Sequence, residues 1–546
     1  MPHRTMGVAH VFISGSHFLL IVLQLLFSST IAGIPTDPEF FPIQLVDHAN
    51  STTEYWTQRF YSNKRFFAGP GHPIILILGG EGEIEPNTGI FYPVVVNKYA
   101  KSFGALVVQP EHRFYGVSQP ISREKIDNAQ KNGRPDPRIE LFTTEQALKD
   151  AIRLSKFLAQ KVYGCNVDDK SSRQYCPILT VGGSYPGFMS AMARFRFPND
   201  VDIAYAASAP MKFYAQQVPS TDYYDHITSV AEASFPSCSR AIRKALYDVV
   251  QYFSVNAWIP DGSLAESVGV CKGTVPVGYI ADESTFIEEL MMVVGYTFAN
   301  QNMAYYPPSE ATALMQSCMM FSASTEDQEF GSLAKVNSFL TKALSGSTQS
   351  CWNMTSQLPS GANASISAGD WSGVGTGSSG ESWDFQTCTL LVEKIGFGPY
   401  SMFPHRNFTY HWLEKHCKAR FGTTPTPFKL VKEWNFDKLV EAGANRILFT
   451  NGLKDGWSVS GILSNLSSTL LALNFPNGAH HSDLNGHGPR DDDTPDIRKG
   501  YVQIQNILAE WLEELPSYKL YGRHAVVSER EGLRGGDSKQ ALASSR

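Results

Sequence analysis

The fold of this chain is decided by ILTVGGSYPG, residues 178–187. An apolar run ends in two glycines and Ser184, and the following segment, residues 188–194, is compatible with a helix. This order predicts a strand, a sharp turn and a helix, with the serine hydroxyl presented at the edge of a sheet. Pro186 stands where the usual G-x-S-x-G pattern has its second glycine, and proline suits the first turn of a helix. The stretch therefore indicates either a nucleophile elbow or an ordinary glycine-rich turn of an α/β protein.

Buried strands alternate with helices on both sides of this stretch. Continuous apolar runs, typical of strands in a parallel sheet covered on both faces, occur at residues 73–78, 105–109, 202–210, 446–450 and 470–474. A helix capped by Thr143 or Thr144 precedes the serine stretch, and a last amphipathic helix spans about 497–515. We therefore expect an α/β fold with a mostly parallel sheet and right-handed crossovers.

The middle of the chain differs in character from both ends. Strand patterns fade between residues 211 and 430, and helical patterns dominate, apart from a Gly/Ser-rich loop at 359–382. This predicts a helical, disulfide-braced lid inserted into the sheet domain. The expected organisation is a signal peptide (1–33), a first core part (34–210), the lid (211–430), a second core part (431–525) and a disordered tail (526–546).

Composition and the amino terminus indicate the compartment. The net charge of -6 favours neither nucleic acid nor an anionic membrane surface as a partner. The apolar run 18–27 followed by small residues is typical of a secretory signal peptide, with an uncleaved anchor as the alternative. It is shorter than the roughly 20 residues of a membrane span, so no stable span is expected after cleavage. The lysosome or vacuole and the extracellular space both stay open.

The cysteines and glycosylation motifs agree with secretion. Eight cysteines behind a signal peptide predict disulfides, and a local bridge between Cys165 and Cys176 is the one pairing that the spacing favours. The sequence contains no C-x-x-C pair and no Walker loop, which favours neither a zinc site nor nucleotide use. Five N-x-S/T motifs occur, at Asn50, Asn353, Asn363, Asn407 and Asn465.

A nucleophilic serine needs a base and an orienting acid, which in this type of fold follow it in the order Asp, His. Asp455 follows the strand at 446–450, and the pair His480 and His481 follows the next strand. The glycine-rich turn at 79–83 ends an early buried strand, where such enzymes supply an oxyanion N–H, although an ordinary β-turn fits equally. The cluster 110–116 leaves the same edge, and we interpret it as a buried network in which Glu111 and Arg113 satisfy each other or backbone carbonyls.

Seven stretches together resemble one family of serine peptidases, which includes lysosomal Pro-Xaa carboxypeptidase, a lysosomal dipeptidyl peptidase and thymus-specific serine protease. They cover the chain from about 60 to 515 in the family's order: Gly80–Glu83, Glu111–Gly116, Gly182–Tyr185, Ala206–Pro210, Trp383–Thr389, Asn451–Trp457 and Gly478–His481. The resemblance implies an α/β-hydrolase core with a helical insertion. It also implies hydrolysis of proline-containing peptides after proline, with no metal and no cofactor.

By motif position the resemblance implies a role for each candidate residue. Ser184 is the nucleophile, Asp455 the orienting acid and His480 the base, with His481 as the fallback. The backbone N–H of Tyr185 and an amide near Gly80 or Glu81 form the oxyanion hole. Trp457 packs against the substrate proline or is a core residue, and Glu81 is a candidate partner for a substrate amine.

The chain departs from the family pattern in three places. Pro186 stands where the best-known members have glycine, and Gly456 stands where they often have proline. The lid sequence also matches poorly. Because the lid decides which peptide terminus is held, carboxypeptidase and dipeptidyl-peptidase activities stay open, as does homodimer formation. Two other functions remain to be compared: an esterase or lipase on the same fold, and a non-catalytic secreted binding protein.

Overall fold

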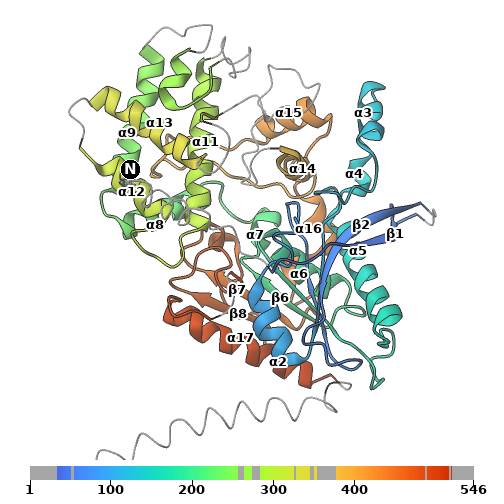
Figure 1. The fold of residues 1–546 in the computed structure, drawn as a ribbon. Helices are drawn as coiled ribbons and strands as arrows, with labels where there is room; N and C mark the ends of the chain where they lie inside the picture. Colours follow the sequence, from blue (N-terminus) through green and yellow to red (C-terminus); the bar gives the residue numbers. More distant parts are fainter. Residues whose placement is uncertain are drawn as a thin grey trace, which may run out of the picture.

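The computed structural model describes residues 34–50, 54–255, 263–272, 283–324, 328–344, 350–352, 377–485, 489–515 and 518. The expected signal peptide and tail, and the motifs at Asn353 and Asn363, lie outside these ranges. Figure 1 shows a sheet layer with helices around it and a second, helical part above it.

The centre of the fold is an eight-stranded sheet with the order β1-β2-β4-β3-β5-β6-β7-β8. The strands β3 to β8 are parallel to one another, and only β1 and β2 at one edge pair in antiparallel fashion. This confirms the mostly parallel sheet of an α/β-hydrolase core. The strands are β1 Glu39–Leu45, β2 Tyr55–Asn63, β3 Ile74–Ile77, β4 Leu106–Pro110, β5 Ile178–Gly183, β6 Ile203–Ala207, β7 Ile447–Gly452 and β8 Leu470–Phe475.

Helices cover both faces of this sheet. Alternate residues of each strand point to opposite sides, and the buried strands have apolar residues on both sides that pack against helices. On one face, Ile74 and Leu76 of β3 pack in a core with α5 (Thr144–Phe157) and α6 (Tyr185–Arg196). On the other face, Ile75 and Ile77 pack in a core with η1 (Val95–Ala100) and α17 (Pro495–Glu513). Smaller elements are α2 Lys101–Phe103, α3 Arg123–Lys131, α4 Arg138–Leu141, η2 Leu158–Val162 and η5 Gly456–Ser460.

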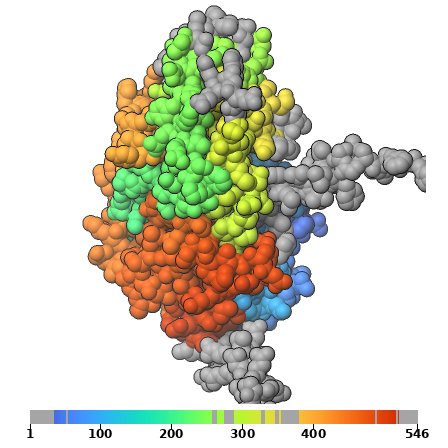
Figure 2. All heavy atoms as spheres, turned by 90° about the vertical axis from the view of Figure 1, so that its left-hand side faces the viewer, coloured from blue at the N-terminus to red at the C-terminus, as the bar shows by residue number. Residues whose placement is uncertain are grey.

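The segment between β6 and β7 is helical throughout its described elements, and we call it the helical region. Figure 2 shows its residues, green to yellow, seated on the carboxy-terminal part of the sheet domain, red. Its elements are α7 Met211–Tyr214, α8 Asp222–Ser234, α9 Cys238–Val255, η3 Ser263–Val268, α11 Glu283–Met303, α12 Ala313–Ser322, α13 Gln328–Ala343, α14 Gly377–Thr387, α15 Tyr410–Phe421, α16 Lys429–Trp434 and η4 Phe436–Lys438. None of the helices in the described ranges is long and apolar enough to cross a membrane.

The helical region has a hydrophobic core of its own. That core is built mainly from α8, α9, α11, α12 and α13, and it also takes in Trp457 and Ala479 from the loops after β7 and β8. The two parts of the molecule therefore share apolar contacts at the edge of the sheet where β7 and β8 end. Burial of this kind stabilises an arrangement in proportion to the apolar area removed from water.

Four disulfides brace the described chain: Cys165–Cys176, Cys238–Cys318, Cys271–Cys351 and Cys388–Cys417. The predicted local bridge between Cys165 and Cys176 is confirmed. The predicted loop at 359–382 is wrong at its carboxyl end, because α14 begins at Gly377. Trp383 and Phe385 of this helix are buried, and their packing offsets the low helix propensity of its glycine and serine residues.

Candidate active site

Ser184 lies on the sharp turn between β5 and α6. Its backbone has φ 67° and ψ −133°, a conformation that L-residues rarely adopt. Such strained conformations are often found at functional turns. A Cβ on Gly182 would lie 2.2 Å from the Pro186 carbonyl oxygen, and one on Gly187 would lie 2.5 Å from the Ala207 carbonyl oxygen. Strand and helix therefore approach so closely that only glycine fits at both positions, while Pro186 sits in the first turn of α6.

Asp455 and His480 meet beyond the ends of β7 and β8. Asp455 Oδ2 lies 2.6 Å from His480 Nδ1, and both side chains are buried. The other carboxylate oxygen of Asp455 accepts a hydrogen bond of 3.0 Å from the Trp457 N–H. With Asp455 facing Nδ1, Nε2 is the ring nitrogen that is left to exchange a proton with a substrate or a nucleophile.

The neighbouring His481 makes different contacts. Its Nδ1 lies 3.0 Å from Asn485 Oδ1, and its backbone N–H donates to the Ser208 hydroxyl at 2.9 Å. Burial and the nearby charge of His480 lower the pKa of His481 to about 3. A Cβ on Gly183 would lie 2.7 Å from the His481 ring. His481 is therefore a neutral ring packed under the serine turn, and the contact with Asp455 belongs to His480.

The end of α11 holds the acid and base loops in place. The Asn302 amide accepts from the Gly456 N–H at 2.8 Å and donates to the Lys454 carbonyl at 2.8 Å. The next residue, Met303, accepts from the His480 N–H through its carbonyl at 3.3 Å. The sequence analysis missed both residues, because no local pattern in a helix of the middle region points to a loop so far along the chain.

The turn after β3 lies against the start of α6. A Cβ on Gly80 would lie 2.8 Å from the ring of Pro186, so the amides around Gly80 and Glu81 lie beside the Ser184 turn. Burial raises the pKa of Glu81 to about 7, and the nearby positive charge of His480 opposes the rise. Backbone N–H groups at a helix start and in a glycine turn are the donors that stabilise an oxyanion.

A buried network fixes Tyr185, the residue after the serine. Its hydroxyl lies 3.2 Å from His112 Nε2 and accepts a 3.2 Å hydrogen bond from Gln386 of α14. Burial lowers the pKa of His112 to about 4, and its Nδ1 donates to the Arg113 carbonyl at 2.7 Å. Neutral His112 therefore accepts from the Tyr185 hydroxyl. Three of the motif stretches, Glu111–Gly116, Gly182–Tyr185 and Trp383–Thr389, thus meet at the start of α6.

Glu111 and Arg113 do not pair with each other as we expected. Glu111 pairs with Arg59 at 2.5 Å and accepts from the Ile84 N–H at 2.9 Å, which anchors the turn after β3. Arg113 forms two hydrogen bonds with Asp150, of 2.6 and 2.7 Å, and also donates to backbone carbonyls. Each charge is buried with its own partner, because an unpaired buried charge is costly. Of the two expected arrangements, the pairing of Glu111 with Arg113 is wrong, and bonding to backbone carbonyls is confirmed for Arg113.

One pocket of about 320 Å³ brings the candidate residues together. Gly80, Glu81, Ser184, Trp457 and His480 all line it. The other lining residues come from the segments after β3, β5, β6 and β8 and from the helical region: Leu78, Gly82, Phe91, Tyr92, Gly183, Pro186, Pro210, Tyr214, Met303, Trp383, Glu393 and His481. The volume lies at the lower end of the range for ligand pockets, and the walls combine aromatic rings with a few polar groups.

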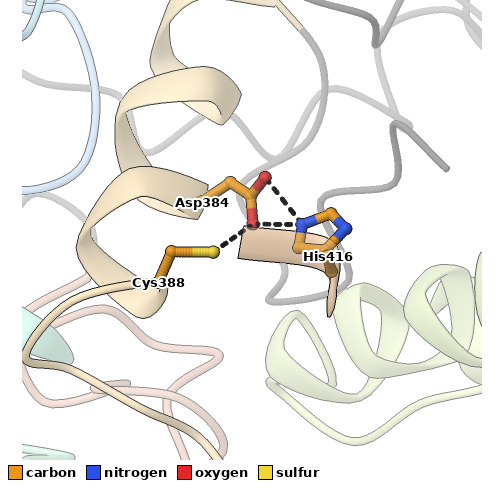
Figure 3. Close-up of side chains that lie close together, drawn as sticks. All are labelled: Asp384, Cys388 and His416. Atoms are coloured by element: carbon orange, nitrogen blue, oxygen red, sulfur yellow. Dashed lines mark hydrogen bonds and ion pairs between the residues drawn. The ribbon is translucent and has the colours of Figure 1, made fainter. Parts of the chain in front are cut away.

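A second cluster, Asp384, Cys388 and His416, has the residue types of a metal site (Figure 3). Cys388 is bonded to Cys417, so its sulfur is not available as a thiolate ligand. Asp384 is held by Arg420 and by His416, whose Nε2 lies 3.0 Å away. Burial opposes ionisation of Asp384, but these two positive partners outweigh it and lower the pKa of the carboxyl. The cluster is a buried ion-pair network that joins α14 to α15.

The sequence of this chain is similar to that of several known proteins. Residues 44–503 match the family described as serine carboxypeptidase S28. The chain is 27% identical to human lysosomal Pro-X carboxypeptidase, over 83% of this chain and 86% of that protein. It is 26% identical to mouse thymus-specific serine protease, over 84% of each. It is also 26% identical to a Caenorhabditis elegans protein called prolyl carboxy peptidase like protein 5, over 81% of this chain and 84% of that protein.

Proposed function

The chain belongs to the serine carboxypeptidase S28 family and is a serine peptidase, and from this premise we propose that it is an exopeptidase that cleaves peptides after proline. The observation that carries the proposal is the contact of 2.6 Å between Asp455 and His480, in the same pocket as the strained Ser184. Two relatives are named as Pro-X carboxypeptidase and as a protein like prolyl carboxypeptidase, which supports proline as the residue before the cleaved bond.

In the proposed mechanism Ser184 attacks the carbonyl carbon of the proline residue. His480 removes the hydroxyl proton through Nε2 and later gives it to the leaving amine, while Asp455 orients the ring and stabilises its positive charge. Water then attacks the acyl-enzyme with His480 again as base, and the acyl fragment is released. His480 is preferred to His481 as base because the Asp455 carboxylate faces its ring.

The backbone around the serine supplies the oxyanion site of this proposal. The Tyr185 N–H at the start of α6 is one donor, and an amide near Gly80 or Glu81 is the second. The network that holds the Tyr185 hydroxyl supports this role, because it fixes the helix start from below. Donors that are already in place when charge develops contribute more than donors that must reorganise.

Trp457 is the proposed wall for the substrate proline. Its ring lines the pocket and packs against Tyr223 with ring centroids 4.8 Å apart. Its Nε1 points at the Met303 sulfur at 3.3 Å, so the indole is held from the side of the helical region. A rigid aromatic face suits the flat apolar ring of proline.

The helical region is proposed to act as a lid, with the division into core and lid at about residues 210 and 430. It contributes Tyr214, Met303, Trp383 and Glu393 to the pocket and thus stands between the nucleophile and solvent. The names of the mammalian relatives support the lysosome, and the predicted signal peptide supports the secretory route.

The test is a nucleophile substitution in the purified full chain. Ser184→Ala is expected to abolish cleavage of proline-containing peptides and labelling by a fluorophosphonate, while circular dichroism and the thermal midpoint stay unchanged. Ser229→Ala, at an exposed position of α8, is the control and is expected to keep the labelling. Retained peptidase activity in the first variant contradicts the proposed nucleophile.

A further inference from the structure

We infer that Glu393 and Glu81 bind the free amino-terminal ammonium of the substrate, so that the enzyme releases dipeptides from the amino end of peptides. This inference deepens the proposed function and rests on it. It adds Glu393 as a specificity-determining residue from the helical region, where the sequence analysis placed no site residue.

The charge of the pocket carries the argument. Two carboxylates, those of Glu81 and Glu393, line the space beside Ser184. Among the described residues that line this pocket there is no lysine and no arginine. A carboxypeptidase must hold the negative charge of a peptide carboxyl end, and placing it beside carboxylates without a cation is unfavourable. An ammonium group meets the opposite situation, because it gains a charged partner when it leaves water.

The two carboxylates act on the same part of the pocket. Tyr214 of α7 donates its hydroxyl to Glu393 Oε1 at 3.4 Å. Burial raises the pKa of Tyr214 well above its usual value, and the charges of Glu393 and of Glu81 add to this rise. One buried phenol therefore senses both carboxylates, one from the turn after β3 and one from the helical region. Burial raises the pKa of Glu81 to about 7, and a cation placed near this phenol would favour the ionised form of Glu81 and would be attracted by both carboxylates.

The size of the pocket limits the length of chain that it accepts. Two extended residues span about 7 Å. A pocket of about 320 Å³ is small for a longer chain, and the aromatic rings of Trp383, Tyr214 and Trp457 form its walls. A proline between these rings leaves one residue before it, whose ammonium then faces the carboxylates. The position of the carboxylates therefore limits the released fragment to two residues.

A lysine or arginine side chain carries the same kind of charge as an amino terminus, so the substrates must separate the two. Three fluorogenic amides do this with the purified full chain: Ala-Pro, acetyl-Ala-Pro and acetyl-Lys-Pro. We expect kcat/KM for Ala-Pro to exceed kcat/KM for each acetylated substrate by about 100-fold or more. Hydrogen bonds to a charged group contribute more to binding than hydrogen bonds between neutral groups. Equal cleavage of Ala-Pro and acetyl-Ala-Pro, or fast cleavage of acetyl-Lys-Pro, overturns the inference.

A variant pair ties the preference to Glu393. In Glu393→Gln the ratio of kcat/KM for Ala-Pro to that for acetyl-Ala-Pro is expected to fall by about 10-fold or more. A loss of folded protein lowers both rates equally and leaves this ratio unchanged, so the ratio reports binding of the amine. Glu232→Gln, at an exposed position of α8, is the matched control and is expected to keep the ratio of the unmodified chain.

The outcomes separate this inference from the proposed function. Cleavage only of a blocked peptide ending in Pro-Phe, by an enzyme that needs Ser184, overturns the amine site and leaves the serine peptidase proposal standing. Proline-directed cleavage that survives Ser184→Ala overturns the proposed nucleophile whatever the substrate preference. An unchanged ratio in Glu393→Gln contradicts the role of that residue.

Discussion

At the scale of single residues, the active site depends on a few positions that permit no larger side chain. Ser184 has positive φ. A Cβ added to the glycines on either side of it would lie closer to backbone or ring atoms than Cβ atoms normally do. Gly183 is small because the neutral ring of His481 packs on it. The second histidine of the pair thus packs against the turn that presents the serine.

The proposed role of Asp455 as orienting acid can be tested by one substitution. Asp455→Asn is expected to lower kcat by about 10⁴-fold, because an amide facing His480 Nδ1 favours the wrong tautomer of the ring. Asp437→Asn, at an exposed position, is the control and is expected to leave kcat unchanged. Single-turnover cleavage of a proline substrate measures the effect, and a loss of less than 10-fold would speak against Asp455 as the orienting acid.

Glu81 links stability to pH. Its pKa in the folded protein, about 7, lies above the usual value of 4.5, so folding takes up a proton between these two values. The stability from this group is complete below pH 4.5 and is lost as pH rises through 7. We expect Glu81→Gln to raise the thermal midpoint relative to the unmodified chain at pH 8 and to leave it unchanged at pH 4. A rise of equal size at both pH values contradicts the raised pKa of this carboxyl.

At the scale of secondary-structure elements, α11 joins the helical region to the catalytic loops. Its last turn contacts the loop of Asp455 through Asn302 and the loop of His480 through Met303. The hydrophobic core of the helical region includes Trp457, two residues after the acid. The geometry of the acid and the base therefore depends on how this helix is packed, and not only on the sheet that carries the two loops.

Asn302→Ala tests this dependence. Removing the amide leaves the buried Gly456 N–H and Lys454 carbonyl without this partner, which costs about 1–3 kcal/mol in stability. We expect kcat to fall about 10-fold with a smaller change in KM, because Asp455 loses its support. Asn300→Ala, two positions earlier and on the opposite face of α11, is the control. An unchanged kcat would place the support of Asp455 in the sheet domain alone.

At the scale of the whole molecule, the core of the helical region meets the sheet domain, which has a core on each face of the sheet, at the carboxyl edge of the parallel strands. The sheet domain supplies Ser184, His480 and Trp457 to the pocket, and the helical region supplies Tyr214, Met303, Trp383 and Glu393. Cys238–Cys318 joins α9 to α12 across 80 residues of the helical region. The bridge limits the freedom of the unfolded region and keeps the wall that carries Met303 and Glu393 in a defined place.

Loss of this bridge is expected to affect the helical region first. For a loop of this length, replacing both cysteines with alanine should cost about 4 kcal/mol on the chain-entropy estimate. We expect an added unfolding transition at lower temperature by calorimetry and faster proteolysis within residues 211–430. Replacement of Cys165 and Cys176, which close a loop of only 11 residues in the sheet domain, is the comparison and should leave that region protected. Equal effects of both replacements would contradict a hydrophobic core in the helical region that is separate from those of the sheet domain.

The sequence by itself determined the parallel sheet and the strand–turn–helix at Ser184, and it placed Asp455 and the histidine pair after the last two strands. These depend on apolar runs and turn residues that are neighbours in the chain, and the loops that follow parallel strands must meet at one edge. Only the tertiary structure decided that Asp455 faces His480 rather than His481, that Glu111 and Arg113 have separate partners, and that Asn302 and Glu393 reach the site. These contacts join residues far apart in the chain, and their side chains are placed by packing between two cores, which no local pattern encodes.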